Sequence, residues 1–136
     1  MLVVDASAVT ELLLGRSAAH AVAECLRDHD FDLHAPHLLD LEVLSGLRRV
    51  VAAGDASTER AEEAIDDLCA LPVERHRHDP LIPRIWELRD NVSAYDAAYV
   101  ALAEAIADEP ATLITADARL ARAVDAHTRV RVIFAG

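Results

Sequence analysis

Residues Ser93 to Ala103, with the sequence SAYDAAYVALA, form the segment around which the rest of the chain is organised. Ser93 precedes a run of helix-forming residues and is a predicted N-cap, because its hydroxyl can accept a hydrogen bond from a free N–H of the first turn. Asp96, three residues later, can complete a capping box. The following residues are small, apolar or aromatic on almost every side, so we predict a helix that is buried between neighbouring elements.

The carboxylate of Asp96 is unexpected in such a helix. No residue three or four positions away carries a positive charge, and burying an unpaired carboxylate is costly in free energy. Taken alone, Asp96 is most simply explained as an acid that interacts with the positive end of the helix dipole. The alternative is a partner that comes from a distant part of the chain.

The composition limits the classes of protein to consider. The 136 residues suffice for one domain, which we expect to span 1–136. Acids outnumber bases by 24 to 13, every base is arginine, and the net charge is −11. Nucleic acid can therefore be a substrate only if cations or a local arginine surface overcome the repulsion of phosphate. We expect no membrane segment, no secretory signal, a cytoplasmic location, and free, buried thiols at Cys25 and Cys69.

Short apolar strands alternate with helices along the whole chain. We predict strands at 2–4, 31–35, 73–75, 112–114 and 130–134, and helices at 6–14, 18–27, 37–53, 57–70, 79–91, 93–107 and 117–124. This alternation is typical of an α/β fold with a mainly parallel central sheet of about five short strands flanked by helices. In the helix from residue 79, the apolar face is predicted to contain Leu81, Ile82, Ile85 and Leu88.

Four acids occupy notable places in this arrangement. Asp5 follows the first strand and Asp117 follows the fourth, and ligands of parallel sheets bind beyond the carboxyl ends of the strands. Glu42 lies inside a long helix and Asp96 in the first turn of the central one. Glu42, Asp96 and Asp117 all lack a cation three or four residues away.

Each acid also has a structural explanation. Asp5 could cap the first helix, Asp117 could be a first-turn acid, and Glu42 could reach Arg48 or Arg49 across a helix interface. Any one of these explanations is simpler than a functional role. Four such explanations at once are harder to accept in a chain with so few bases.

Carboxylates without nearby histidine or cysteine suit a hard cation, Mg²⁺ or Mn²⁺, better than zinc. A cation would relieve the repulsion that otherwise raises at least one carboxyl pKa. It could also polarise a phosphoryl oxygen and lower the pKa of a water molecule. Ser7 and Thr115, each close to one of the acids, could orient that water or bind phosphate, or they could be helix caps.

Four motifs together resemble those of the PIN-domain ribonucleases, and most closely the VapC-type toxins of bacterial toxin–antitoxin pairs. They are VVDASA at 3–8, DLEV at 40–43, SAYDAAY at 93–99 and LITADARL at 113–120. The resemblance extends from residue 2 to about residue 134 and implies a three-layer PIN-like fold.

The resemblance also implies an activity. Asp5, Glu42, Asp96 and Asp117 would be the catalytic residues and would hold Mg²⁺, with Mn²⁺ as a possible substitute. Water activated by the metal would attack a phosphodiester of tRNA, rRNA or mRNA in line, and the product would carry a 5′-phosphate. Loss of the intact RNA would inhibit translation and growth. The resemblance further implies a homodimer and a small VapB-like antitoxin protein that blocks the site.

The sequence departs from the family pattern at one point. Some members carry a further acid near the fourth motif, whereas residues 118–121 contain none here and Asp125 lies too far along the helix. A second, well-held metal ion is therefore not predicted. Arg49 and Arg119 are candidate phosphate-binding residues, although a solvated helix face is the simpler explanation for each. The helices at 37–53 and 57–70 are the predicted groove for the antitoxin.

Other interpretations remain open. One is a catalytically inactive PIN-like domain that acts as a protein- or RNA-binding module, and another is a purely structural α/β scaffold. A receiver-type signalling domain needs a lysine, and the chain has none. The basic run RHRH at 75–78 either contacts RNA or is a surface turn. We expect no zinc site there, because no second Cys or His motif completes the ligand set.

Overall fold

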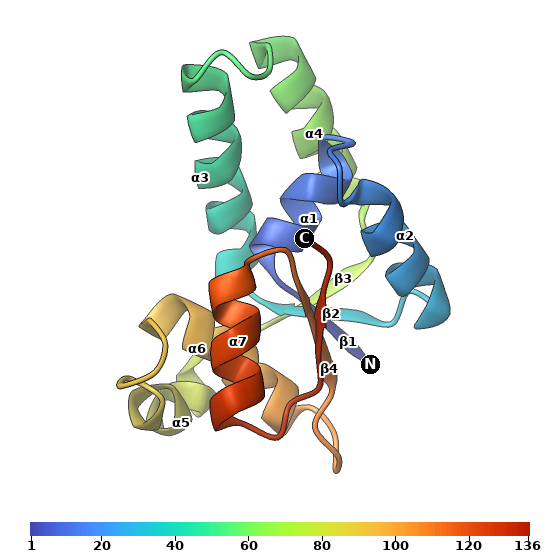
Figure 1. Cartoon of the computed structure of the whole chain (residues 1–136). Helices are drawn as coiled ribbons and strands as arrows, with labels where there is room; N and C mark the ends of the chain where they lie inside the picture. Colours follow the sequence, from blue (N-terminus) through green and yellow to red (C-terminus); the bar gives the residue numbers. More distant parts are fainter.

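The computed structural model describes residues 1–136 and contains a single five-stranded sheet, in which all strand pairs are parallel (Figure 1). The strand order is β3-β2-β1-β4-β5. The strands are β1 (Leu2–Val4), β2 (Leu33–Pro36), β3 (Val73–His76), β4 (Thr112–Thr115) and β5 (Val132–Phe134). The predicted α/β fold with about five short parallel strands is confirmed. The central strands are almost wholly buried, which explains their continuous apolar sequences.

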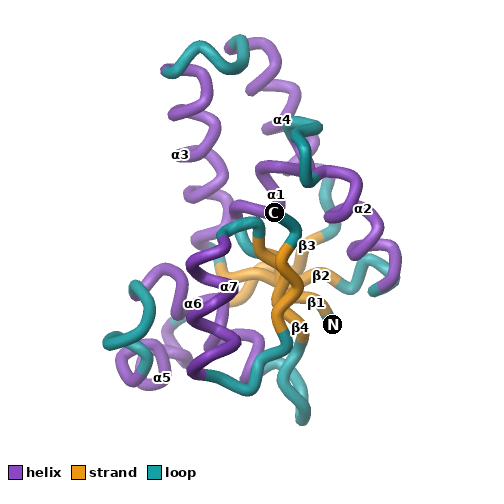
Figure 2. The backbone as a smooth tube through the Cα atoms, in the orientation of Figure 1, coloured by secondary structure: helices purple, strands orange, loops and turns teal.

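Seven α-helices and one 3₁₀ turn connect the strands. The helices are α1 (Ala6–Leu13), α2 (Ala19–Asp28), α3 (Leu38–Ala52), α4 (Thr58–Ala70), α5 (Ile82–Glu87), α6 (Ala94–Ala105) and α7 (Ala118–His127), with the 3₁₀ turn at Asp79–Leu81. Figure 2 shows α1 to α4 in the upper part of the view and α5 and α6 at the lower left, with the strands between the two groups. Helices therefore cover the sheet from two sides, as in other α/β folds.

Helix α6 is the buried central helix that its sequence predicts. Every residue from Ala97 to Ala103 is buried, and Tyr99 is fully so. The backbone N–H of Asp96 donates to the Ser93 hydroxyl at 3.2 Å, so the predicted N-cap is present. Tyr95 departs from the prediction: two-thirds of its surface is exposed, because the first turn of α6 projects beyond the core.

Three local predictions are wrong. The second strand does not begin at residue 31, because Asp30 and Phe31 have φ values of 53° and 54° and form a turn instead. The helix predicted at 79–91 is a 3₁₀ turn followed by the short α5, in which Ile82 is exposed rather than part of the apolar face. Both cysteines are free as expected, but Cys69 is exposed while Cys25 is buried.

Helices α3 and α4 form a hairpin that extends away from the sheet (Figures 1 and 2). The turn between them begins at Gly54, whose φ of 77° is readily adopted by glycine. Ser57 then caps α4 by accepting a hydrogen bond from the N–H of Arg60 at 3.1 Å. No helix of the structure has both the length and the apolar character that crossing a bilayer requires.

Candidate active site

The four acids singled out from the sequence line one cavity, with a volume of about 490 Å³. They come from four different places: Asp5 from the end of β1, Glu42 from α3, Asp96 from the first turn of α6, and Asp117 from the junction of β4 and α7. The parallel register of β1 and β4 explains part of this arrangement, because it ends both strands at one edge of the sheet. Ser7, Arg49 and Arg119 also line the cavity.

Asp5 is the most deeply buried of these acids, with 5% of its surface exposed. Its Oδ2 atom accepts hydrogen bonds from the hydroxyls of Ser7 at 2.5 Å and Thr115 at 2.8 Å. The two hydroxyls accept in turn from the backbone N–H groups of Ala116, at 2.9 Å, and Asp117, at 3.0 Å. Burial raises the pKa of Asp5 despite these donors. Ser7 and Thr115 thus hold the carboxylate and join the ends of β1 and β4.

Glu42 is half-buried, and the hydroxyl of Tyr99 donates to its Oε1 at 2.9 Å. Neither Arg48 nor Arg49 forms an ion pair with Glu42, although the charge of Arg49 opposes the rise of its pKa. Burial raises the pKa of Glu42, the Tyr99 hydrogen bond opposes that shift, and the other acids of the cavity reinforce it. Burial also raises the pKa of Tyr99 well above its ordinary value, so the phenol remains a donor.

Asp96 and Asp117 share a single arginine. Nη2 of Arg119 lies 3.7 Å from an oxygen of each carboxylate. Burial raises the pKa of Asp96, the charges of Asp5 and Asp117 raise it further, and Arg119 opposes both effects. The other oxygen of Asp117 accepts from the N–H groups of Arg119 and Leu120, so Asp117 is also the N-cap of α7.

Three further polar residues line the cavity that sequence reasoning missed: Thr10, Glu11 and Arg16. Glu11 is the most informative, because its Oε2 atom is buried without a hydrogen-bond partner and lies 3.9 Å from Nε of Arg16. The sequence could have indicated Glu11 through its spacing, because it follows Ser7 by four residues and so lies on the same helix face. A fifth acid is therefore present at the cavity, contributed by α1 rather than by the fourth motif.

The donor atoms of the cavity match a hard divalent cation. Every side-chain group that could be a ligand is an oxygen of Asp, Glu, Ser, Thr or Tyr, and neither histidine nor cysteine lines the cavity. No three of these acids have carboxylate oxygens that all lie within 4.8 Å of one another. Like charges repel one another, and side-chain rotations would be needed to bring three of these oxygens to one ion.

Three of the four residues in the basic run RHRH at 75–78 contact neighbouring side chains. The guanidinium of Arg75 donates two hydrogen bonds to the carboxylate of Asp40, at 2.7 and 2.8 Å. Arg77 pairs with Asp79 at 2.8 Å. His76 instead lies close to Glu74 on its own strand and to His34 on the adjacent strand β2. Strand pairing thus brings His76 close to two ligand-type side chains that the sequence of the run does not indicate, whereas the expectation that the run forms no zinc site stays a prediction.

Comparisons with known proteins agree with this architecture. A family model described as PIN domain matches residues 2–126. Ribonuclease VapC1 of Mycobacterium tuberculosis is 44% identical over 132 residues, which are 96% of each chain. Ribonuclease VapC9 of the same organism is 41% identical over 98% of each chain, and Ribonuclease VapC12 is 35% identical over 98% of this chain and 99% of its own. A solved structure, PAE2754 from Pyrobaculum aerophilum, covers 96% of this chain and 81% of its own with a TM-score of 0.69 and 23% identity, which indicates a shared fold.

Proposed function

Because this chain belongs to the PIN-domain family, as one of its VapC-type ribonucleases, we propose that it is the Mg²⁺-dependent endoribonuclease toxin of a toxin–antitoxin pair. Its relatives are named as ribonucleases, which supports RNA as the substrate. In this proposal the enzyme acts in the cytoplasm, cleaves tRNA, rRNA or mRNA, and thereby inhibits translation and growth.

The observation that carries the proposal is the convergence of Asp5, Glu42, Asp96 and Asp117 on one cavity of oxygen donors. Burial raises the pKa of the first three, and mutual repulsion of the carboxylates adds to the shift of Glu42 and Asp96. These four acids would hold Mg²⁺, with Mn²⁺ as a substitute, because a divalent cation removes that repulsion. When bound, the cation supplies Lewis acidity toward the phosphodiester and a lowered pKa for water.

The other residues of the cavity would position the carboxylates and the RNA. Ser7 and Thr115 fix the orientation of Asp5 through their hydrogen bonds to its Oδ2. Arg119, with 77% of its side chain exposed at the mouth of the cavity, and Arg49 would contact the phosphate backbone. If a phosphate group of the RNA drew Arg119 away from Asp96, the cation would supply the positive charge that Asp96 then lacks. Binding of the metal would therefore favour binding of the RNA.

The test of this proposal is RNA cleavage by the purified protein with Mg²⁺, followed by sequencing of the 5′ ends of the fragments. We expect defined cleavage sites with 5′-phosphates from the wild type and none from Asp96→Asn. Asp66→Asn is the matched control, because Asp66 lies exposed on α4, outside the cavity. RNA binding without cleavage by the wild type would favour the inactive binding module instead.

The antitoxin is proposed to bind between α3 and α4. A groove of about 490 Å³ lies between the two helices and is lined mainly by apolar side chains, including Leu44, Leu47, Val51 and Ile65. Leu44 has 40% of its surface exposed, although it is apolar. An amphipathic helix of the antitoxin would fill such a groove with its apolar side chains.

A substitution in this groove tests whether the antitoxin binds there. Leu44→Arg is expected to weaken binding of the co-expressed antitoxin at least about tenfold, because it places a charge in the apolar groove. Leu41→Arg is the control, since Leu41 is exposed on the same helix but does not line the groove. Equal antitoxin affinity for the two variants would place the partner elsewhere. Leu68 is unsuitable for this test, because it is 3% exposed and its replacement would disrupt the core.

The protein is also proposed to form a homodimer, as the family resemblance implies. Light scattering of the isolated toxin checks this part of the proposal, with a mass of twice 14.7 kDa expected.

A further inference from the structure

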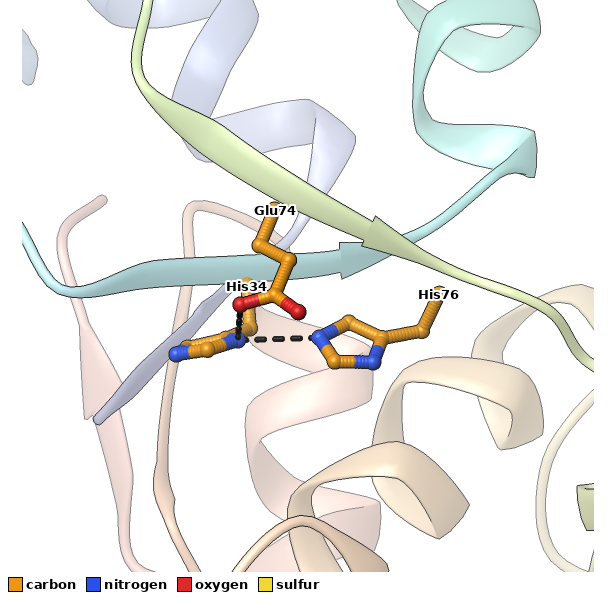
Figure 3. A group of neighbouring side chains, drawn as sticks. All are labelled: His34, Glu74 and His76. Carbon is orange, nitrogen blue, oxygen red and sulfur yellow. Dashed lines mark hydrogen bonds and ion pairs between the residues drawn. The ribbon is translucent and has the colours of Figure 1, made fainter.

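A second group of ligand-type side chains lies on the sheet, away from the acidic cavity. It consists of His34 on β2 with Glu74 and His76 on β3 (Figure 3). His34 and Glu74 are register partners in the parallel pair, and His76 follows Glu74 by two residues, so all three side chains are on one face of the sheet. None of the three lines the cavity that holds the four acids.

The hydrogen bonds orient His34 in the way that a metal ligand requires. Its Nε2 lies 2.8 Å from Oδ1 of Asp32, an acceptor, so Nε2 carries a proton and the neutral form of the ring presents the lone pair of Nδ1. That Nδ1 atom lies 2.9 Å from Nε2 of His76 and 3.6 Å from Oε2 of Glu74. A histidine whose second nitrogen donates to a carboxylate is the usual arrangement around protein-bound transition metals.

We propose that His34, Glu74 and His76 form a binding site for a divalent transition metal of the zinc class, which links the edge strand β3 to β2. Tetrahedral zinc with bonds of about 2.0–2.1 Å to nitrogen and oxygen holds its ligand atoms about 3.3 Å apart. The separations of 2.9 and 3.6 Å from Nδ1 of His34 lie on either side of that value, and all three ligand atoms lie within 4.8 Å of one another, so the group matches the size of such a site. The metal takes the place of the proton on Nε2 of His76, and the neutral His76 ring then carries its proton on Nδ1.

The ligand types distinguish this site from the acidic cavity. Two imidazoles with one carboxylate select zinc, cobalt, nickel or copper over Mg²⁺, whereas the all-oxygen cavity selects Mg²⁺ or Mn²⁺. His34 is almost completely buried, which fixes one ligand, and Glu74 has 69% of its side chain exposed, which leaves the metal accessible from solvent. Three protein ligands leave the fourth position of a tetrahedral ion for water.

The proposal is tested by equilibrium binding of Zn²⁺ and Co²⁺ to the full chain in excess Mg²⁺, which is added to fill the acidic cavity as the proposed function requires. We expect one equivalent of Zn²⁺ to bind, and Co²⁺ to give the intense visible absorption of a tetrahedral site. His76→Gln should weaken Zn²⁺ binding at least about tenfold, and Asp32→Asn about 10–100-fold through the orientation of His34.

His78→Gln is the matched control, because His78 is exposed two residues beyond His76 and lies outside the group. Glu74→Gln replaces an exposed ligand and serves as a second variant if His76→Gln does not fold. Absence of Zn²⁺ binding by the wild type, or equal affinities of His76→Gln and His78→Gln, would overturn the proposal. The outcome is independent of nuclease activity, because the readout is metal binding at residues outside the acidic cavity.

Discussion

Replacing Tyr99 by phenylalanine tests how the fold holds Glu42. Tyr99 is fully buried, and its hydroxyl donates to Glu42 at 2.9 Å. A hydrogen bond to a charged acceptor contributes about 1.5–3 kcal/mol, so Tyr99→Phe should lower the free energy of unfolding by about that amount at neutral pH. For 136 residues with an unfolding entropy of about 2.1 cal/mol/K each, this corresponds to a loss of about 5–10 °C in Tm.

The effect of Tyr99→Phe should also depend on pH. The hydrogen bond lowers the pKa of Glu42 relative to the variant, so the stabilisation is present while the carboxylate is ionised. It is lost as pH falls through the pKa of Glu42, because the neutral carboxyl gains less from the phenol. Thermal and urea unfolding of both proteins in the presence of a chelator give the loss in free energy of unfolding at neutral and at acidic pH.

Tyr95→Phe is the control, because Tyr95 lies on the same helix with 67% of its surface exposed. Its effect should stay within about 0.5 kcal/mol. The reasoning is refuted if Tyr99→Phe is as stable as Tyr95→Phe at neutral pH, or if its loss of stability does not shrink in acid.

Two further predictions concern the buried carboxylates. Thr115→Val should lower the free energy of unfolding by about 1–3 kcal/mol in urea titrations, because the N–H of Asp117 and Oδ2 of Asp5 both lose a partner; Thr112→Val on the same strand should change it little. In chelator, the stability of the wild type should fall as pH rises from near 4 through the raised pKa values of Asp5, Glu42 and Asp96, because the native state there binds more protons than the unfolded chain. A constant urea midpoint over that range would contradict the second prediction.

The sequence predicts the fold well because its signals are local and agree with one another. Apolar strands followed by polar residues, the Ser93 cap and the apolar run of α6 each favour one local structure, and together they favour only a parallel α/β sheet. Where a local pattern competes with chain geometry, the prediction is wrong. Phe31 looks like a strand residue, but the turn after α2 needs left-handed backbone at this position.

In the candidate site, too, positions set by local structure could be predicted, whereas contacts between residues far apart in sequence could not. Strand ends bring Asp5 and Asp117 to one edge of the sheet, and sequence position alone predicts this. The partner of Glu42 is Tyr99, 57 residues away, and no spacing rule indicates that contact. Likewise, His34 meets His76 only through the register of two strands that are 42 residues apart in sequence at these positions.

The most direct measurement of the central claim is the stability of Asp96→Asn and wild type with and without Mg²⁺. If the cavity concentrates repelling carboxylates, Asp96→Asn should be more stable than wild type in chelator, by about 0.5–2 kcal/mol. Mg²⁺ should then stabilise the wild type more than the variant, because the variant lacks one ligand. Asp66→Asn should match the wild type throughout. A wild type at least as stable as Asp96→Asn in chelator, with equal gains from Mg²⁺, would contradict the account.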